Sequence, residues 1–238
     1  MSTKLNREPD NEPAEKTLAK VLGLFTQEQL PHLRGKLSYQ TGVLAAFALA
    51  ASVLLGFADL TTRDAIQARL QEDLKASLEQ VMPAALHDND LLADTITLPS
   101  ADANIGAAET IVYLAKKQGQ VTGVCFKLVA PDGYSGPISL VMGMDKNGEI
   151  LGVRVIAHTE TPGLGDKIEI GKSNWVLSFN GQSLANLSPA QWAVKKDGGV
   201  FDQFAGATIT PRKTVQTIKR GLEFFKAHRS ELVGSSTE

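Results

Sequence analysis

The stretch that organises this chain is Asp202-Gln203-Phe204-Ala205-Gly206-Ala207-Thr208-Ile209-Thr210-Pro211. Gly206 and Ala207 are the smallest residues, so another molecule can approach the backbone closely at that point. Thr210 is a favourable N-cap, and Pro211 would then occupy the first helical position, where its missing N–H is not needed. Apolar residues follow at spacings of three and four, namely Val215, Ile218, Leu222 and Phe225. The pattern predicts a tight turn that leads directly into a helix with one buried face.

Thr208 falls just outside the N-terminus of this expected helix. Free N–H groups and the positive end of the helix dipole make that place suitable for a phosphate group. The dipole contributes about 0.3–1 kcal/mol when exposed and up to about 2 kcal/mol when partly buried, which can orient a phosphate but not retain it. On local sequence alone, an ordinary helix cap after a glycine turn is the favoured interpretation, because Gly-Ala-Thr is a common sequence.

Composition limits the classes of function. The chain has 238 residues and a formal net charge of −2, with scattered basic residues and few aromatic ones. These features argue against nucleic acid as a partner. The single cysteine, Cys125, excludes an internal disulfide and a thiolate-held iron–sulfur or zinc cluster within this chain. Its apolar neighbours predict that Cys125 is a small core residue.

Residues 37–58 carry no charge and are dominated by Ala, Leu, Val and Phe. As a helix this run is about 33 Å long, enough to cross the hydrocarbon core of a bilayer. The small-x-small sequence Gly56-Phe57-Ala58 leaves a cleaved signal peptide as an alternative, although the preceding segment is unusually long for one. Arg34 and Lys36 precede the run and Asp59 follows it, so we expect residues 1–36 in the cytoplasm and the rest outside.

The remainder of the chain predicts an α+β domain. Residues 61–81 repeat apolar side chains every fourth position and end before Pro83, which predicts a helix within a stalk-and-loop segment of residues 59–109. This helix either packs on the domain or links the domain to the membrane, and one helix can do both. From residue 110 the period changes to two, which predicts hairpins 110–115 with 121–129 and 138–144 with 150–157, the second closed by a primed Asn-Gly turn. We expect an antiparallel sheet packed against helices in a domain of residues 110–229, followed by a tail of residues 230–238.

Two further segments are candidates for a binding site. Residues 158–167 combine two glycines with a proline, which is typical of a rigid turn or of a loop that lets a flat ligand come close. No second histidine stands at metal-ligand spacing from His158, so we expect no metal there. Lys195 and Lys196 precede the organising stretch, and such a cationic pair is either a solvated turn or a partner for a phosphodiester. Trp175, Phe179 and Trp192 are typical of core residues.

The organising stretch resembles the motif Asp-x-x-(Ser/Thr)-Gly-Ala-Thr, on whose last threonine a flavin transferase attaches FMN through a phosphoester. The resemblance extends over residues 42–229 and is carried by three more segments of the chain, at residues 130–136, 158–167 and 192–199. Together they resemble the G subunit of the Rnf (Rsx) electron-transport complex and, more distantly, the C subunit of the sodium-translocating NADH:quinone reductase. Ala205 departs from the motif, because the family usually has Ser or Thr at this position.

The resemblance implies a covalent FMN on Thr208, with Gly206 and Ala207 beside it. It also implies that Thr161, Gly163 and Leu164 lie against the isoalloxazine, and it favours Lys196 near the phosphodiester. No catalytic residue is expected in this chain, and no catalytic triad, paired carboxylates or nicotinamide motif is recognisable.

The resemblance further implies an electron-relay subunit, not catalytic alone, in an inner-membrane complex that couples electron transfer between NADH and ferredoxin to ion translocation. Its expected partners are the other subunits, the flavin transferase during maturation and the lipid bilayer, with the FMN domain in the periplasm. A membrane-anchored flavin-binding or sensory module outside such a complex, and a structural domain with an unmodified Thr208, are the alternatives.

Overall fold

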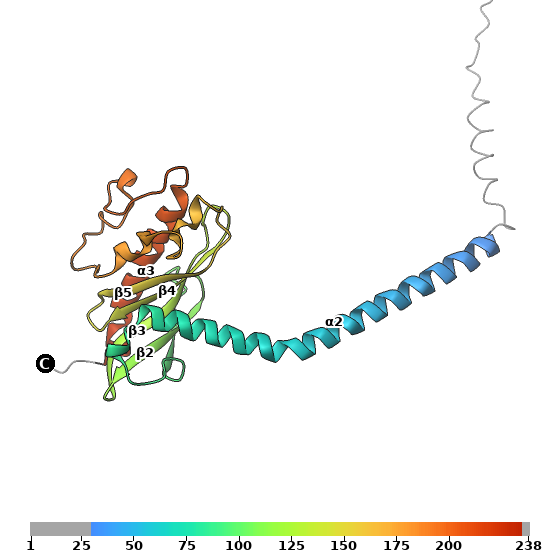
Figure 1. The fold of residues 1–238 in the computed structure, drawn as a ribbon, viewed down its shortest axis with the longest axis horizontal. Helices are drawn as coiled ribbons and strands as arrows, with labels where there is room; N and C mark the ends of the chain where they lie inside the picture. The colour runs from blue at the N-terminus through green and yellow to red at the C-terminus, as the bar shows by residue number, and fades with distance from the viewer. Residues whose placement is uncertain (1–29, 235–238) are drawn as a thin grey trace, which may run out of the picture. The chain divides into compact units, whose positions relative to one another are not determined.

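The computed structural model describes residues 30–234 of the chain (Figure 1). Most of the predicted cytoplasmic extension, and the last four residues of the predicted tail, therefore lie outside the described residues. The chain divides into two units, one ending at Gln67 and the other beginning at Ala68. The longer helices and the strands are α2 (Leu30–Val81), β1 (Thr95–Pro99), β2 (Glu109–Lys117), β3 (Gln120–Ala130), β4 (Ile138–Asp145), β5 (Ile150–Ala157) and α3 (Ile209–Val233).

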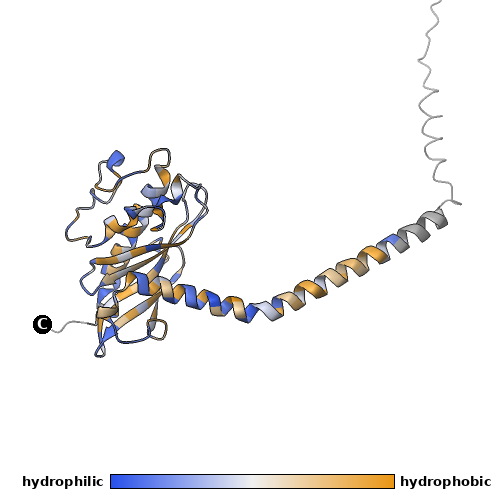
Figure 2. Ribbon diagram, in the orientation of Figure 1, coloured by the Kyte–Doolittle hydropathy of each residue, from blue (hydrophilic) through white to orange (hydrophobic). Residues whose placement is uncertain are grey.

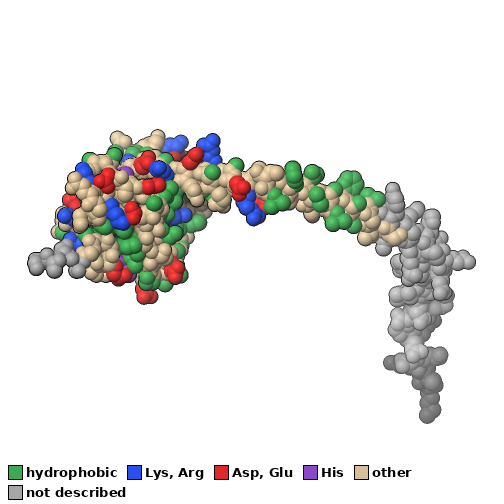
Figure 3. Space-filling model, turned by 90° about the horizontal axis from the view of Figure 1, so that it is seen from below, with side chains coloured by type: hydrophobic (Ala, Val, Ile, Leu, Met, Phe, Trp, Pro, Cys, Tyr) green, Lys and Arg blue, Asp and Glu red, His purple; other side chains and the backbone are tan. Residues whose placement is uncertain are grey.

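Helix α2 contains the predicted membrane-spanning run 37–58. Its apolar side chains are uncovered: Leu44, Phe47, Leu49, Leu54 and Leu55 are each 68–73% exposed. Figure 2 shows the hydrophobic part of the helix, and Figure 3 shows hydrophobic side chains along the same stretch. Among the described residues, α2 is the one helix long and apolar enough to cross a bilayer. Such side chains are stable without protein cover only in an apolar solvent, which agrees with a membrane anchor.

The helix predicted over residues 61–81 is the continuation of α2. Ile66 and Leu70 are more than half exposed, whereas Leu78 and Met82, at and just beyond its C-terminal end, are buried. The last turns of α2 therefore pack on the second unit, and the apolar repeat before them does not.

The second unit contains an antiparallel sheet in which the strands follow one another in chain order, β1-β2-β3-β4-β5. This confirms the predicted antiparallel sheet and both predicted hairpins. The prediction misses β1, which lies within the predicted stalk-and-loop segment of residues 59–109. Strand β1 is short and lies at the edge of the sheet, where Pro99 at its end is tolerated.

Helices cover both faces of the central strands (Figure 1). On one face, Phe126 and Met142 belong to the core beneath α3, which also contains Ile218. On the other face, Cys125 and Val141 pack with residues at the C-terminal end of α2. Because neighbouring residues face opposite cores, these strands form apolar runs rather than a strict alternation. The domain therefore has the α+β architecture that the sequence predicts.

One of the two hairpin turns differs from the prediction. A type I′ turn needs positive φ at both central residues, and this occurs at Gln118 (φ 54°) and Gly119 (φ 78°) between β2 and β3. Between β4 and β5 only Gly148 has positive φ, so the predicted primed Asn147-Gly148 turn is wrong. Instead, Asp145 Oδ1 accepts hydrogen bonds from the N–H groups of Asn147 and Glu149 and organises a longer loop.

Candidate flavin-binding cleft

Helix α3 begins at Ile209, and Thr208 is its N-terminal flanking residue. The Arg212 N–H donates to the Thr208 carbonyl over 3.3 Å, which starts the helix before the predicted cap at Thr210. The prediction of Thr210 as N-cap and Pro211 as first residue is therefore wrong. Pro211 is the third helical residue, where its missing N–H is still harmless because the first four N–H groups have no intrahelical partner.

The Thr208 side chain is half-buried and makes no capping hydrogen bond. Its hydroxyl has no hydrogen-bond partner in the described part of the chain. Thr208 φ and ψ are −75° and −29°, so the residue already has helical geometry and its hydroxyl is not needed to close the helix. This hydroxyl is available for chemistry.

A glycine turn leads to Thr208. Gly206 has φ +81°, a conformation that side chains rarely adopt, and the Ala207 N–H donates to the Phe204 carbonyl over 3.1 Å. Trp175 fixes this turn to the core, because its Nε1–H donates to the Asp202 carbonyl (2.7 Å) and its ring packs edge-on against Phe204. The predicted core positions of Trp175, Phe179 and Trp192 are confirmed, since all three belong to the core beneath α3.

The loop of residues 158–167 faces the same turn. Within it, the N–H groups of Leu164 and Gly165 both donate to the Thr161 carbonyl over 3.1 Å. Gly163 has φ +78°, which the tight turn requires. The side chain of Leu164 comes next to Gly206, since a Cβ built on Gly206 would lie 3.5 Å from Leu164 Cδ2.

Glu160 connects three segments at the floor of this region. Its carboxylate is 4% exposed; Oε2 accepts from the Thr210 hydroxyl (2.6 Å), and Oε1 accepts from the Ser135 N–H (3.2 Å). Gly165 leaves the room for it, because a Cβ there would lie 2.7 Å from Glu160 Oε2. The sequence offers no support for Glu160 as a general base, and the structure provides it with two hydrogen-bond donors that tie the loops to α3.

His158 secures the same loop from its other side. Its Nδ1 accepts a hydrogen bond from the Glu160 N–H (3.0 Å), so its Nε2 carries the proton donated to Glu169 Oε1 at 2.5 Å. His158 is therefore engaged on both ring nitrogens. The described residues contain no group of three or more His, Cys, Asp or Glu side chains arranged to hold a metal ion.

These segments enclose a cleft of about 230 Å³ that Thr208 lines directly. The family resemblance implies that Thr161, Leu164, Gly206, Ala207 and Thr208 share one site, and all five line the cleft. It is also lined by residues that the sequence did not single out as site residues: Tyr134, Glu160, Gly165, Ile209 and Thr210. Three of the lining side chains are large, apolar and well exposed: Tyr134 (67%), Leu164 (42%) and Ile209 (39%). An exposed apolar rim is not visible in a sequence, because only the packing decides which apolar residues stay uncovered.

Gly163 and Lys196 are not among the residues that line the cleft. Lys195, rather than Lys196, pairs with Asp202, with Nζ and Oδ1 2.6 Å apart. Arg212 pairs with Asp197 through two hydrogen bonds of 2.5 and 2.8 Å, and these bonds hold the pKa of Asp197 below its ordinary value. They also raise the pKa of Arg212.

The site fits the FMN that the fold family implies. The free Thr208 hydroxyl could form a phosphoester, whose phosphate would lie at a helix N-terminus, and the glycine turn lets a ligand approach the backbone. The cleft is too small to enclose a whole flavin. The part of the isoalloxazine ring system that lies outside the cleft would lie over Tyr134, Leu164 and Ile209, whose exposed apolar surfaces suit an aromatic ring.

Comparison with known proteins gives the class of protein that this site belongs to. Residues 133–223 match the FMN-binding domain family. This range includes Tyr134, the loop of residues 158–167 and Thr208, so the matching segment contains the cleft.

Curated relatives then give the particular family. The chain is 55% identical over 191 residues to the G subunit of the ion-translocating oxidoreductase complex of Cereibacter sphaeroides, covering 80% of this chain and 85% of the relative. It is 47% identical over 191 residues to the G subunit of the same complex from Vibrio cholerae, covering 80% and 90%. A crystal structure of the C subunit of the Na⁺-translocating NADH-quinone reductase from Parabacteroides distasonis matches with 23% identity and a TM-score of 0.38, covering 55% of this chain and 65% of that one. The chain belongs to the family of G subunits of ion-translocating oxidoreductase complexes, which confirms the resemblance found in the sequence.

Proposed function

We propose that this chain carries FMN covalently on Thr208 and acts as an electron relay within an inner-membrane complex that couples electron transfer between NADH and ferredoxin to ion translocation. The observation that carries the proposal is the free, half-buried Thr208 hydroxyl, which lines a cleft at a helix N-terminus within a domain of the FMN-binding family. The flavin supplies one- and two-electron redox chemistry, and the protein supplies its position and surroundings.

Attachment requires one group-transfer step on Thr208. The Thr208 Oγ–P bond forms as the pyrophosphate bond of a flavin adenine dinucleotide donor breaks, AMP leaves and the hydroxyl proton passes to solvent. A flavin transferase catalyses this step. A phosphoester prevents loss of the cofactor outside the cytoplasm, where the domain would otherwise depend on a cleft of about 230 Å³ to retain it.

The residues of the cleft have defined tasks in this proposal. The exposed apolar surfaces of Tyr134, Leu164 and Ile209 contact the ring system, and Gly206 allows it close to the backbone. Arg212 lies one helical turn after Thr208, but its guanidinium is paired with Asp197, so the free N–H groups at the start of α3 are left to meet the phosphodiester.

The proposed placement of the domain is supported by the charges that flank the apolar run. Arg34 and Lys36 precede this run and Asp59 follows it, a distribution that favours a cytoplasmic N-terminus and an FMN domain in the periplasm. Anchoring keeps the domain close to the other subunits of its complex.

The decisive experiment measures covalent flavin directly. The full-length protein is purified from membranes of a host that has the flavin transferase, denatured, and analysed by intact mass and in-gel flavin fluorescence. We expect added FMN less one water, on the peptide that contains Thr208. Thr208→Ala removes this flavin and leaves the thermal unfolding temperature unchanged, because the hydroxyl makes no hydrogen bond in the fold.

Thr161→Ala is the matched control, since it removes a hydroxyl from the same cleft and leaves the attachment site intact. Flavin retained in Thr208→Ala, or lost equally in both variants, rejects Thr208 as the attachment residue. Ala205→Ser restores the usual motif at an exposed position, and we expect unchanged or increased flavin content.

A further inference from the structure

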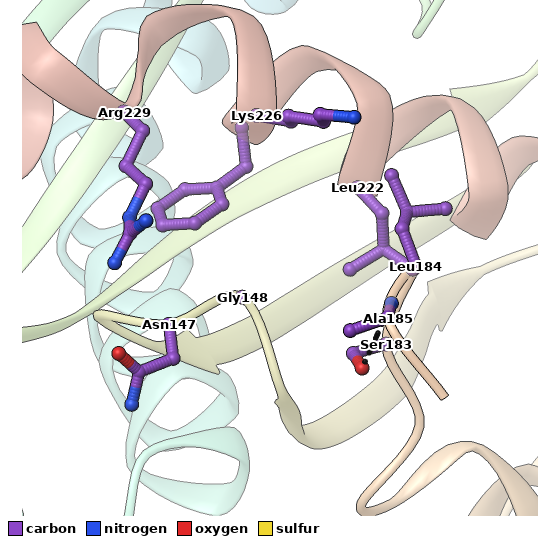
Figure 4. A pocket seen from close by; sticks show the side chains of 9 residues that line it. Asn147, Gly148, Ser183, Leu184, Ala185, Leu222, Lys226 and Arg229 are labelled. Atoms are coloured by element: carbon purple, nitrogen blue, oxygen red, sulfur yellow. Dashed lines mark hydrogen bonds between the residues drawn. The ribbon is translucent and has the colours of Figure 1, made fainter. Parts of the chain in front are cut away.

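A second cavity, of about 260 Å³, lies between the β4–β5 loop, residues 183–185 and the C-terminal half of α3 (Figure 4). Its apolar lining includes Leu184, Leu222 and Phe225, and the last two are 2% exposed members of the core. The cavity therefore opens directly onto the hydrophobic core, although none of the residues predicted for flavin binding lines it.

Two cations flank this apolar surface. Lys226 and Arg229 project from α3 on opposite sides of the cavity, Arg229 on the side of Asn147 and Lys226 on the side of Leu222 and Leu184 (Figure 4). Arg229 Nε donates to the Lys146 carbonyl over 3.0 Å, which holds the Arg229 guanidinium beside the β4–β5 loop. Among the residues that the structure describes, no acidic side chain lines the cavity.

These cations lack the acidic partners found elsewhere on the helix. Arg212, Lys213 and Lys219 each pair with a carboxylate. Within residues 30–234, by contrast, no ion pair holds Lys146, Lys226 or Arg229. The helix dipole does not account for them, because its effect is confined to the last turn and no basic residue lies there.

The size of the cavity favours a protein side chain over a small ligand. Ligand sites occupy about 300–1,000 Å³, whereas this cavity has about 260 Å³ and an open mouth. One large apolar side chain of a protein partner would fill it, in the manner of an interface anchor. A carboxylate next to that anchor would pair with Lys226 or Arg229.

We propose that this cavity docks an acidic segment of another subunit of the same complex, which inserts an apolar side chain between Lys226 and Arg229. The position of the cavity is compatible with a domain that carries a flavin. Leu222 lies fourteen residues after Thr208 along α3, about 21 Å of helix, so docking leaves the candidate flavin cleft uncovered. This inference rests on membership in a multi-subunit complex and not on covalent flavin.

The test uses the full-length chain in its complex, solubilised from membranes. The variant Lys226→Glu/Arg229→Glu is compared with Lys75→Glu/Lys127→Glu, which makes the same change in net charge at two exposed lysines elsewhere on the second unit. We expect the first variant to retain the other subunits about tenfold less well or worse, because a desolvated charge pair becomes a repulsion. The control variant behaves as the unmodified chain does.

A zero-length carbodiimide cross-linker then identifies the occupant. In the intact complex we expect an amide bond between Lys226 Nζ and an Asp or Glu of another subunit, located by peptide mass spectrometry. Unfolding temperatures show that each variant is folded, and Lys226→Gln/Arg229→Gln replaces the charge reversal if that variant does not fold.

The proposal is overturned by full retention of the other subunits in the charge-reversed variant. It is also overturned by a Lys226 cross-link to a second copy of this chain, or by protection of Lys226 by anionic lipid vesicles in the absence of other subunits. Intact-mass analysis reports separately on flavin attachment, so failure of that proposal would be recognised independently.

Discussion

At the scale of the residue, Glu160 determines how the start of α3 is held. Its buried carboxylate accepts hydrogen bonds from Thr210, fifty positions later in the chain, and from the Ser135 N–H. Glu160 thereby ties two loops to the helix that presents Thr208. A buried acceptor that loses its donor incurs the full cost of desolvation, so these contacts are sensitive to small changes.

Thr210→Val removes one of the two donors to Glu160. We expect a loss of about 1–3 kcal/mol in the free energy of unfolding, because a buried carboxylate oxygen is left without a partner. Urea unfolding followed by tryptophan fluorescence measures this change. Thr210→Ser keeps the hydroxyl, so it should reduce the free energy of unfolding less than Thr210→Val does. Thr159 is exposed, and Thr159→Val should reduce the free energy of unfolding by less than about 0.5 kcal/mol. Equal effects of the three substitutions would contradict the role of Glu160.

Asp197 contributes to the dependence of folding stability on pH in the acid range. The hydrogen bonds from Arg212, and then its charge, lower the pKa of Asp197 in the folded chain below the ordinary value of 3.8. A lowered folded pKa stabilises the fold above the ordinary value, and that stability is lost as the pH falls through the folded pKa. Lys213 acts on the pKa of Asp132 in the same direction.

We therefore expect the unfolding temperature to fall as the pH is lowered below about 4. Asp197→Asn should reduce this dependence slightly, because the group that takes up the proton is absent. Differential scanning calorimetry between about pH 3 and pH 7 measures the effect, which is small because the pair is at the surface. A steeper fall of the unfolding temperature with decreasing pH in Asp197→Asn than in the unmodified chain would contradict this assignment.

At the scale of the element, the end of α2 depends on two glycines in the sheet. A Cβ on Gly143 of β4 would overlap the carbonyl of Val81, and a Cβ on Gly152 of β5 would lie 3.0 Å from Val81 Cα. The sheet thus leaves a smooth surface on which the last turn of α2 lies, with Leu78 and Met82 buried beside it.

Gly143→Ala should destabilise the domain by about 1–3 kcal/mol, because backbone rather than a flexible side chain must move to make room. Gly171→Ala is the matched control, since a Cβ at that position meets nothing within 4 Å. Chemical unfolding of both variants measures the difference. A cost for Gly143→Ala no greater than that for Gly171→Ala would show that α2 does not press on the sheet.

At the scale of the whole molecule, α2 has two kinds of surroundings. Its first part presents uncovered apolar side chains, and its last turns belong to the core of the second unit. One continuous helix thereby contains both a run long and apolar enough to cross a bilayer and a C-terminal end that belongs to the FMN-binding unit.

We expect the protein to remain in the membrane fraction after extraction at alkaline pH, because the apolar run has no protein cover. Protease added outside spheroplasts should digest the second unit and leave an N-terminal epitope tag intact, as the flanking charges require. Digestion of the tag with protection of the second unit would reverse the proposed orientation, and release by alkali would reject the anchor.

The sequence by itself determined most of the elements, the fold class and the motif that carries the family resemblance. These depend on local properties: the uncharged run of residues 37–58, the period-two hairpins from residue 110, and the glycine turn before Thr208. Neighbours in the chain establish such patterns, so they can be interpreted without knowledge of packing. The short edge strand β1 was missed because five residues give too little periodicity.

The tertiary structure alone decided which further side chains join that site. It brought Tyr134 and Glu160 to Thr208, made Thr210 a buried donor to Glu160 instead of the cap, and left Lys196 off the cleft. It also showed that Lys226 and Arg229 flank an opening into the core. The physical reason is that burial and hydrogen-bond partners depend on segments that lie far apart in sequence, and packing a sheet against helices brings those segments together.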